Sequence, residues 1–134
     1  MPLVWNDSLL TGVVIIDSQH KELFRRINEL LESAGRSKER IQEITDFLQN
    51  YVRNHFLTEE TLMQRANYPE YQLHKRAHDK YSQDFKELKD TIDKEGINLN
   101  LTVKMNQLMI DWWINHINSV DKKMAQFLKE KRVS

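Results

Sequence analysis

Histidine is the residue whose placement in this sequence most strongly suggests chemistry. The chain has five histidines, and each falls on a stripe of apolar residues with helical spacing, where a packed core would normally carry leucine. They are His20, His55, His74, His78 and His116. Glu59 joins them, one helical turn after His55. Burying such groups without partners would cost several kcal/mol per group, so the sequence predicts something inside the fold that binds them.

Each of these signals is weak when taken alone. His74 and His78 are four residues apart, about 40° around a helix, so both rings point the same way and can share a metal ion. Two solvated or hydrogen-bonded histidines are nevertheless the commoner reason for that spacing. His55 and Glu59 have the same spacing, and a hydrogen bond on the helix surface is the simpler interpretation there. His20 alone is most often a capping or satisfied core histidine.

Asp121 is the second carboxylate that the pattern places near a histidine. It follows His116 by five residues, about 140° around an ideal helix. Both side chains reach one centre only if the helix ends or is distorted near Asn118 and Ser119. The sequence therefore predicts irregular backbone at that point.

Taken together, seven ligand-type side chains on four expected helices favour a dinuclear metal centre. Seven ligands are too many for one zinc ion, which usually takes four. They suit two octahedral ions bridged by carboxylates, which in a helical bundle usually means iron or manganese, and the imidazole-rich set favours iron. The repeated Glu-x-x-His pattern of ferritin-like bundles is absent from the sequence, as is the His-Glu-x-x-His pattern of zinc proteases.

The elements that must position these side chains are expected to be helices. With only three glycines and two prolines in 134 residues, the chain has few of the turns that an all-β fold needs. We expect an all-α fold with one domain over residues 1–134, an up-down-up-down antiparallel four-helix bundle with short connections. The expected segments are an irregular N-terminal arm over 1–16, bundle helices at about 17–34, 38–66, 69–95 and 99–118, and a short C-terminal helix at about 119–131.

The N-terminal arm carries Trp5 and the apolar run 13–16. That run has the composition of a short strand, but no second convincing strand is available to pair with it, so we expect it to pack on the bundle as irregular chain. Asp17 or Ser18, both good N-cap residues, is expected to begin the first helix.

Composition excludes several classes of function. Acidic and basic residues balance to a net charge of zero, so there is no concentrated positive field for nucleic acid or an anionic membrane surface. There is no cysteine, which rules out disulfides and zinc–thiolate sites. No apolar run approaches the roughly 20 residues that span a bilayer, and Met1–Thr11 lacks the pattern of a secretory signal. We therefore expect a cytoplasmic protein.

Four segments of the sequence resemble the bacterial hemerythrin family. They are IDSQHK at 16–21, HFLTEE at 55–60, YPEYQLHKRAH at 68–78 and WWINHINSVD at 112–121. These segments supply all five histidines, Glu59 and Asp121 at the spacing typical of that family. The resemblance covers nearly the whole chain, and every ligand position is filled.

The resemblance implies reversible dioxygen binding for carriage, storage or sensing, without enzyme activity. The cofactor would be two iron ions joined by an oxo or hydroxo bridge. By the family pattern, one iron would bind His74, His78 and His116, the other would bind His20 and His55, and both would share Glu59 and Asp121 as bridging ligands. The iron with two histidines would keep an open position for dioxygen. We expect a monomer, and the sequence identifies no protein partner.

Apolar side chains next to the expected ligands are candidates for the wall of an oxygen pocket. Such a wall keeps out water, which would otherwise help to oxidise the iron. The candidates are Leu23, Phe56, Trp112, Trp113, Ile117 and Val120. For each of them, plain core packing accounts for the residue type equally well.

Trp113 is the one departure from the family pattern, which usually has leucine three residues before the last histidine. An indole that faced the pocket would narrow access to the site or alter the lifetime of the oxygen adduct. An indole that pointed outward would change nothing. The sequence leaves both orientations open.

Two other functions are compatible with the same residues. A di-iron centre can act as an oxidoreductase on peroxide, oxygen or nitric oxide, although the sequence offers no acid–base pair beyond the ligands and no cofactor motif. The chain can also be a metal-free helical interaction module whose histidines are satisfied by hydrogen bonds. Metal content and the response to oxygen separate these alternatives.

Overall fold

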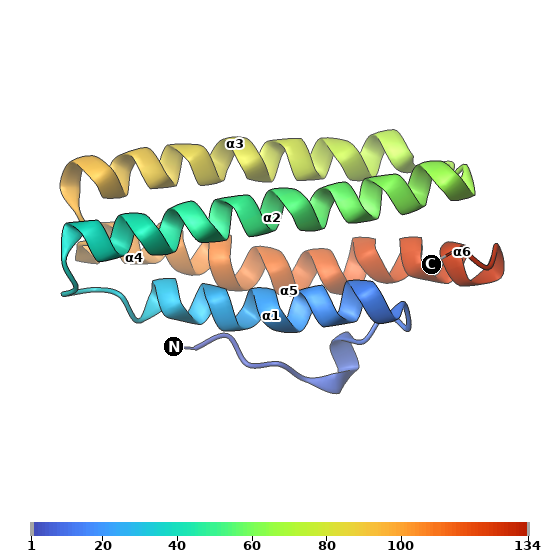
Figure 1. Ribbon diagram of the computed structural model, residues 1–134, viewed down its shortest axis with the longest axis horizontal. Coiled ribbons are helices and arrows are strands. Elements are labelled where there is room, and N and C mark those ends of the chain that lie inside the picture. Colours follow the sequence, from blue (N-terminus) through green and yellow to red (C-terminus); the bar gives the residue numbers. More distant parts are fainter. Residues whose placement is uncertain (1, 134) are drawn as a thin grey trace.

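The computed structural model describes residues 2–133, which form four helical rods packed side by side (Figure 1). Three rods are single helices: α1 (Val14–Leu31), α2 (Lys38–Ala66) and α3 (Tyr71–Glu95). The fourth rod is made of α4 (Leu99–Asn106), η2 (Gln107–Asp111), α5 (Trp112–His116), η3 (Ile117–Asp121) and α6 (Lys122–Glu130). A single 3-10 turn, η1 (Asp7–Leu9), lies in the N-terminal arm.

Successive rods run in opposite directions along the chain (Figure 1). The predicted all-α, up-down-up-down bundle is therefore confirmed, and residues 2–133 contain no strand. None of the helices in this part of the chain is both long and apolar enough to cross a membrane. Residues 1 and 134, the ends of the predicted domain, lie outside the described residues.

The N-terminal arm is shorter than predicted, because α1 begins at Val14 and includes most of the apolar run 13–16. Asp17, expected to begin the helix, lies in its first turn. Its buried carboxylate accepts hydrogen bonds from the backbone N–H and the hydroxyl of Thr11, both at 2.8 Å, and from the Gly12 N–H at 3.1 Å. These bonds fasten the arm to the first turn of the bundle.

The turns between the first three rods lie close to their predicted positions. Ser37 caps α2, because its side chain accepts a hydrogen bond from the Arg40 N–H at 3.1 Å. After α2, Asn67 adopts the left-handed conformation (φ 55°) that asparagine tolerates at a helix C-terminus. α3 starts at Tyr71 rather than at Pro69, because the chain is still turning at Pro69.

The fourth rod stays helical at residues 118 and 119, where the sequence predicted a boundary between two helices. Instead of a break it contains two π-helical segments, η2 and η3. η3 is the irregular backbone that the spacing of His116 and Asp121 predicted at this point. A π-helix has a wider turn, with hydrogen bonds between residues five apart. Two side chains with that spacing can therefore face the same way.

The interior contains two apolar clusters with a polar layer between them. Along α1, Ile16 belongs to one cluster, Leu23 belongs to the other, and the buried His20 lies between them. The antiparallel fourth rod has the reverse order, because Ile117 belongs to the cluster of Leu23, Met124 belongs to the cluster of Ile16, and the buried Asp121 lies between them. Apolar core therefore encloses the polar layer on both sides and shields it from water.

Candidate metal centre

Seven buried side chains meet in the polar layer, and all four rods contribute to them. α1 supplies His20, α2 supplies His55 and Glu59, α3 supplies His74 and His78, and the fourth rod supplies His116 and Asp121. The most exposed of them, His116, retains 5% of its accessible surface. The structure thus brings together and buries all seven residues that the sequence singled out as ligands.

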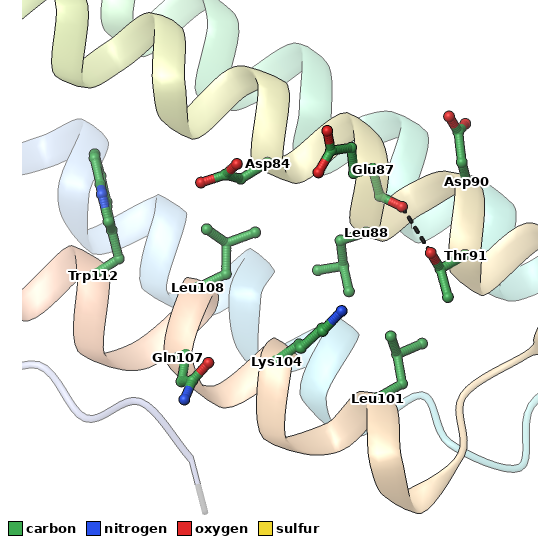
Figure 2. Close-up of a pocket in the computed structure, with 10 residues that line it drawn as sticks. All are labelled: Asp84, Glu87, Leu88, Asp90, Thr91, Leu101, Lys104, Gln107, Leu108 and Trp112. Atoms are coloured by element: carbon green, nitrogen blue, oxygen red, sulfur yellow. Dashed lines mark hydrogen bonds between the residues drawn. The ribbon is translucent and has the colours of Figure 1, made fainter.

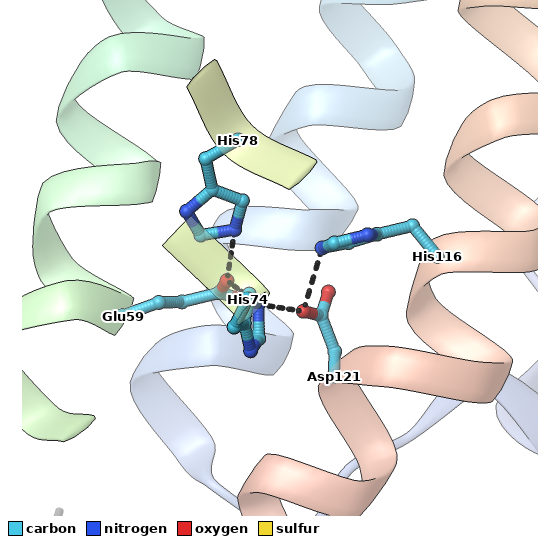
Figure 3. A group of neighbouring side chains, drawn as sticks. All are labelled: Glu59, His74, His78, His116 and Asp121. Carbon is cyan, nitrogen blue, oxygen red and sulfur yellow. Dashed lines mark ion pairs between the residues drawn. The ribbon is translucent and has the colours of Figure 1, made fainter. Parts of the chain in front are cut away.

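Five of these residues form one group, in which three histidines face one oxygen of Glu59 and one oxygen of Asp121 (Figure 3). Oε1 of Glu59 lies 3.1 Å from Nε2 of His78 and 3.3 Å from Nε2 of His74. Oδ1 of Asp121 lies 3.1 Å from Nε2 of His74 and 3.1 Å from Nε2 of His116. The potential ligand atoms of this five-residue group all lie within 4.8 Å of one another, close enough to share one ion.

In a second group, of four residues, two histidines face the other oxygens of the same two carboxylates. Oδ2 of Asp121 is 3.2 Å from Nε2 of His20. Oε2 of Glu59 is 3.1 Å from Nε2 of His55 and 3.6 Å from Nε2 of His20. The potential ligand atoms here also lie within 4.8 Å of one another. Glu59 and Asp121 belong to both groups and turn one oxygen to each, as carboxylates do when they bridge two ions.

The converging nitrogens and oxygens do not satisfy one another's need for hydrogen bonds. The facing nitrogens and oxygens are buried, yet they have no partner in hydrogen-bonding geometry among residues 2–133. They are Nε2 of His20, His55, His74, His78 and His116, and both carboxylate oxygens of Glu59 and Asp121. Unpaired polar atoms in such numbers are costly in a native core. A bound cation would remove that cost, so the donor set fits a metal centre better than a hydrogen-bonded core.

The carboxylates also change the protonation of the imidazoles. Burial alone would lower the pKa of His20, but the adjacent Asp121 and Glu59 raise it to about 9. The same balance raises the pKa of His74 to about 9, whereas for His55 burial prevails and the pKa is lowered. Burial alone would raise the pKa values of Glu59 and Asp121, but the neighbouring imidazoles lower both. Ionised carboxylates are the form that binds a metal.

The six apolar side chains predicted as a pocket wall differ in how closely they approach this cluster. Leu23, Phe56, Trp113 and Ile117 are buried, and Trp112 and Val120 are partly exposed. The ring of Phe56 stacks on His78, with centroids 3.8 Å apart and planes 6° apart. The ring of Trp112 stacks on His116 in the same way, at 4.3 Å and 12°. Aromatic surface therefore covers two of the imidazoles directly.

Trp113 points into the bundle, which settles its orientation. Its side chain is 0% exposed, and its ring centroid lies 6.0 Å from that of His55 and 6.4 Å from that of His20. The indole N–H donates a 2.8 Å hydrogen bond to the hydroxyl of Tyr81, which in turn lies 3.6 Å from the sulfur of Met109. The indole is thus held beside the histidines of the four-residue group.

Three residues that were not selected from the sequence also contact the cluster or its wall. Tyr81 accepts the hydrogen bond of the Trp113 indole. Gln19 is hydrogen-bonded to His55 at 2.7 Å. Glu60 is hydrogen-bonded to His78 at 2.8 Å. Gln19 and Glu60 each directly neighbour a candidate ligand in the sequence. That adjacency is the signal that could have found them.

A surface groove of about 710 Å³ lies between α3 and the fourth rod, beside the cluster rather than at it (Figure 2). Its lining includes the acidic side chains Asp84, Glu87 and Asp90, with Leu101, Lys104 and Leu108 on the facing rod. Trp112 lies at one end and separates the groove from His116, on which its ring stacks. Among the described residues that line it, none is a candidate ligand.

The fold and the site together place the chain in the class of metal-binding four-helix bundles, because every rod buries at least one histidine of the site and two rods each add a carboxylate. Residues 11–128 match the family model described as the hemerythrin HHE cation binding domain. A bacteriohemerythrin of Pseudomonas paraeruginosa is 32% identical over 139 residues, covering 96% of this chain and 88% of that protein. A hemerythrin-like protein of Naegleria gruberi is 34% identical over 122 residues, covering 91% of this chain and 90% of that protein.

The solved structures agree with these sequence relatives. The crystal structure of a wild-type hemerythrin matches with a TM-score of 0.81 at 32% identity, covering 94% of this chain and 97% of that chain. The chain belongs to the hemerythrin family.

Proposed function

We propose that this chain binds dioxygen reversibly at two iron ions held by its seven buried ligand-type side chains. The observation that carries the proposal is the arrangement of Glu59 and Asp121. In each carboxylate, one oxygen faces the histidines of the five-residue group and the other oxygen faces those of the four-residue group. That arrangement suits two ions that share both carboxylates. Membership of the hemerythrin family supports oxygen binding, rather than catalysis, as the function.

The two proposed iron positions differ in their number of donors. The first has five donor residues, His74, His78, His116, Glu59 and Asp121, and the second has four, His20, His55, Glu59 and Asp121. Iron in carboxylate-bridged bundle sites tends toward octahedral coordination. The second position therefore has more room for an added ligand, and we assign dioxygen binding to it.

The surrounding side chains would protect this chemistry from water. When bound, the iron pair supplies the electrons that dioxygen takes up on binding and returns on release. Leu23, Trp113 and Ile117 are fully buried in the adjoining apolar cluster and limit the entry of water. Trp113 also lies beside His20 and His55, so its bulk narrows the space at the position assigned to dioxygen.

We further propose that the chain works as a monomer in the cytoplasm. All seven candidate ligands come from one chain, so the centre needs no second copy. A chain without cysteine has no disulfide that would require an oxidising compartment. Light scattering coupled to size exclusion tests the first point, and cell fractionation tests the second.

Cycling the iron-loaded protein between oxygen and argon tests the proposed function. We expect a visible absorption band that appears under oxygen, disappears under argon and returns over several cycles. A di-iron oxidoreductase would instead consume oxygen steadily when a reductant is added. Steady consumption without a reversible band would contradict the proposal. Glu59→Ala, which removes a ligand from both groups, is the matched control and should show no band.

A further inference from the structure

Two candidate ligands are held at their outer nitrogens by side chains that differ in charge. Nδ1 of His55 lies 2.7 Å from the amide oxygen of Gln19, and Nδ1 of His78 lies 2.8 Å from the carboxylate oxygen Oε2 of Glu60. In both rings the other nitrogen, Nε2, lies 3.1 Å from the carboxylate of Glu59. Each imidazole is therefore held between an outer acceptor and the centre.

The surroundings of Gln19 determine which nitrogen of His55 carries the proton. The hydroxyl of Thr58 donates to the Asn54 carbonyl at 3.1 Å, so its oxygen is free to accept a hydrogen bond from Nε2 of Gln19 at 3.2 Å. The amide of Gln19 must then present its oxygen, an acceptor, to Nδ1 of His55. The proton lies on Nδ1, and Nε2 of His55 keeps a lone pair for a metal.

Glu60 selects the same tautomer of His78, but with a negative charge. An ionised carboxylate only accepts hydrogen bonds, so Nδ1 of His78 must donate. The side chain of Glu60 is only 13% exposed, and water therefore competes little for its oxygen. Such support is selective: the Nδ1 atoms of His20 and His74 have no hydrogen-bond partner within the described residues 2–133.

We propose that Glu60 and Gln19 are positioning residues that make the two metal positions unequal in affinity. The inference rests on the proposed metal centre. A charged acceptor strengthens the outer hydrogen bond and makes the far nitrogen more basic than a neutral amide does. His78 belongs to the five-residue group and His55 to the four-residue group. The position with more donors thus also has the more basic imidazole, and a metal ion binds there first.

Zinc titration of the iron-stripped protein, measured by calorimetry, tests the proposal. The wild-type chain should bind Zn²⁺ in two steps of different affinity. Glu60→Ala should weaken the tighter step by about 10–100-fold, the usual effect of losing such a partner. Glu60→Gln keeps an oxygen acceptor and should weaken that step less, whereas Gln19→Glu should tighten only the weaker step. The double variant Gln19→Glu/Glu60→Gln should bring the two steps closer together at unchanged net charge.

Two controls separate the proposed positioning effect of Glu60 from a loss of packing and from a change in net charge. Glu39→Gln removes the same charge from the exposed start of α2 and should leave both steps unchanged. Thermal unfolding of the zinc-free variants reports any loss of packing. If Glu60→Ala lowers the melting temperature but alters neither zinc affinity, or alters both equally, the proposal is overturned. A wild-type chain that binds no Zn²⁺ would overturn this proposal alone, and one that binds no Fe²⁺ either would overturn the metal centre as well, so the two failures are distinguishable.

Discussion

Nε2 of His116 lies 3.1 Å from Oδ1 of Asp121, although the two residues are five positions apart on one helical rod. In a regular α-helix that spacing would point the side chains about 140° apart. The π-helical segment η3 contains the additional residue in a wider turn and brings both to one face. The geometry of the centre therefore depends on an irregular turn of the backbone as well as on the identity of the ligands.

Changing the length of η3 tests this dependence. An alanine inserted after the exposed Ser119 should turn Asp121 and α6 by about 100° relative to His116, and iron binding should be lost. Deleting Ser119 should instead produce a regular α-helical turn, in which residues four apart share a face, and should preserve the bundle. Iron per chain and circular dichroism measure both effects. Full iron content in the insertion variant would contradict the role given to η3.

Replacing Glu59 should remove the whole centre rather than half of it. Glu59→Ala takes a ligand from both groups, so we expect both ions to be lost and the melting temperature to fall, because metal binding stabilises only the folded chain. His55→Ala takes a ligand from the four-residue group alone and should keep about half of the iron. Metal analysis after desalting measures the difference. Unchanged iron content in Glu59→Ala would count heavily against a bridging role.

Removing the metal should make stability depend on pH. Carboxylates raise the pKa values of His20 and His74 from 6.5 to about 9, against the effect of burial. The charged imidazoles therefore stabilise the folded, metal-free chain fully below pH 6.5, and this contribution is lost as the pH rises through 9. The melting temperature of chelator-treated protein should fall across that window. The iron-loaded protein should lack this decline, because its metal ligands carry no proton on the coordinating atom.

A flat profile for the chelator-treated protein would show that the imidazoles are not charged in the folded, metal-free chain. The same protonation predicts that metal uptake releases protons. Calorimetry in two buffers of different ionisation enthalpy would detect that release.

The hydrogen bond between Trp113 and Tyr81 should contribute to stability on its own. Tyr81→Phe leaves the buried indole N–H without its acceptor and should lower the free energy of unfolding by about 1–3 kcal/mol. Denaturant titration of the metal-free protein measures this loss without interference from iron. In Trp113→Phe/Tyr81→Phe the two effects should be less than additive, because the residues share one interaction. Simple additivity would indicate that the contact carries no coupling energy.

Replacing Trp113 by leucine should widen access to the position that we propose for dioxygen. Trp113→Leu removes bulk beside His20 and His55, so we expect faster oxygen association. We also expect faster loss of the oxygen-binding form, because water that enters the site promotes the oxidation of the iron by oxygen. Stopped-flow mixing with oxygen measures the first rate, and the decay of the visible band measures the second. Rates equal to those of the wild type would mean that the indole does not limit access.

The convergence of these side chains could be predicted from the sequence, because a histidine on an apolar helical stripe must find a partner inside the fold. Five such histidines on four helices indicate one partner that is common to all of them. His74 and His78 share a face through local helix geometry alone, and the irregular turn between His116 and Asp121 was itself visible in their spacing. The start of α1 was not predictable in the same way. Asp17 has the residue type of an N-cap, but its carboxylate is occupied by the arm, which folds back onto it.

The orientation of Trp113 illustrates a second limit of sequence reasoning. Its direction depends on Tyr81, an acceptor on a different rod and 32 residues away in the sequence. The outer partners Gln19 and Glu60 likewise reach histidines on neighbouring rods. Periodicity identifies which residues face the core, but the packing of one rod against another determines which side-chain atoms form hydrogen bonds.

The number of iron ions that one chain binds tests the dinuclear centre most directly. Anaerobic titration of the iron-stripped protein with Fe²⁺, followed by metal analysis of the desalted product, should reach an end point of about two ions per chain. An end point of one ion, or of none, would contradict a centre in which two carboxylates each serve two metals.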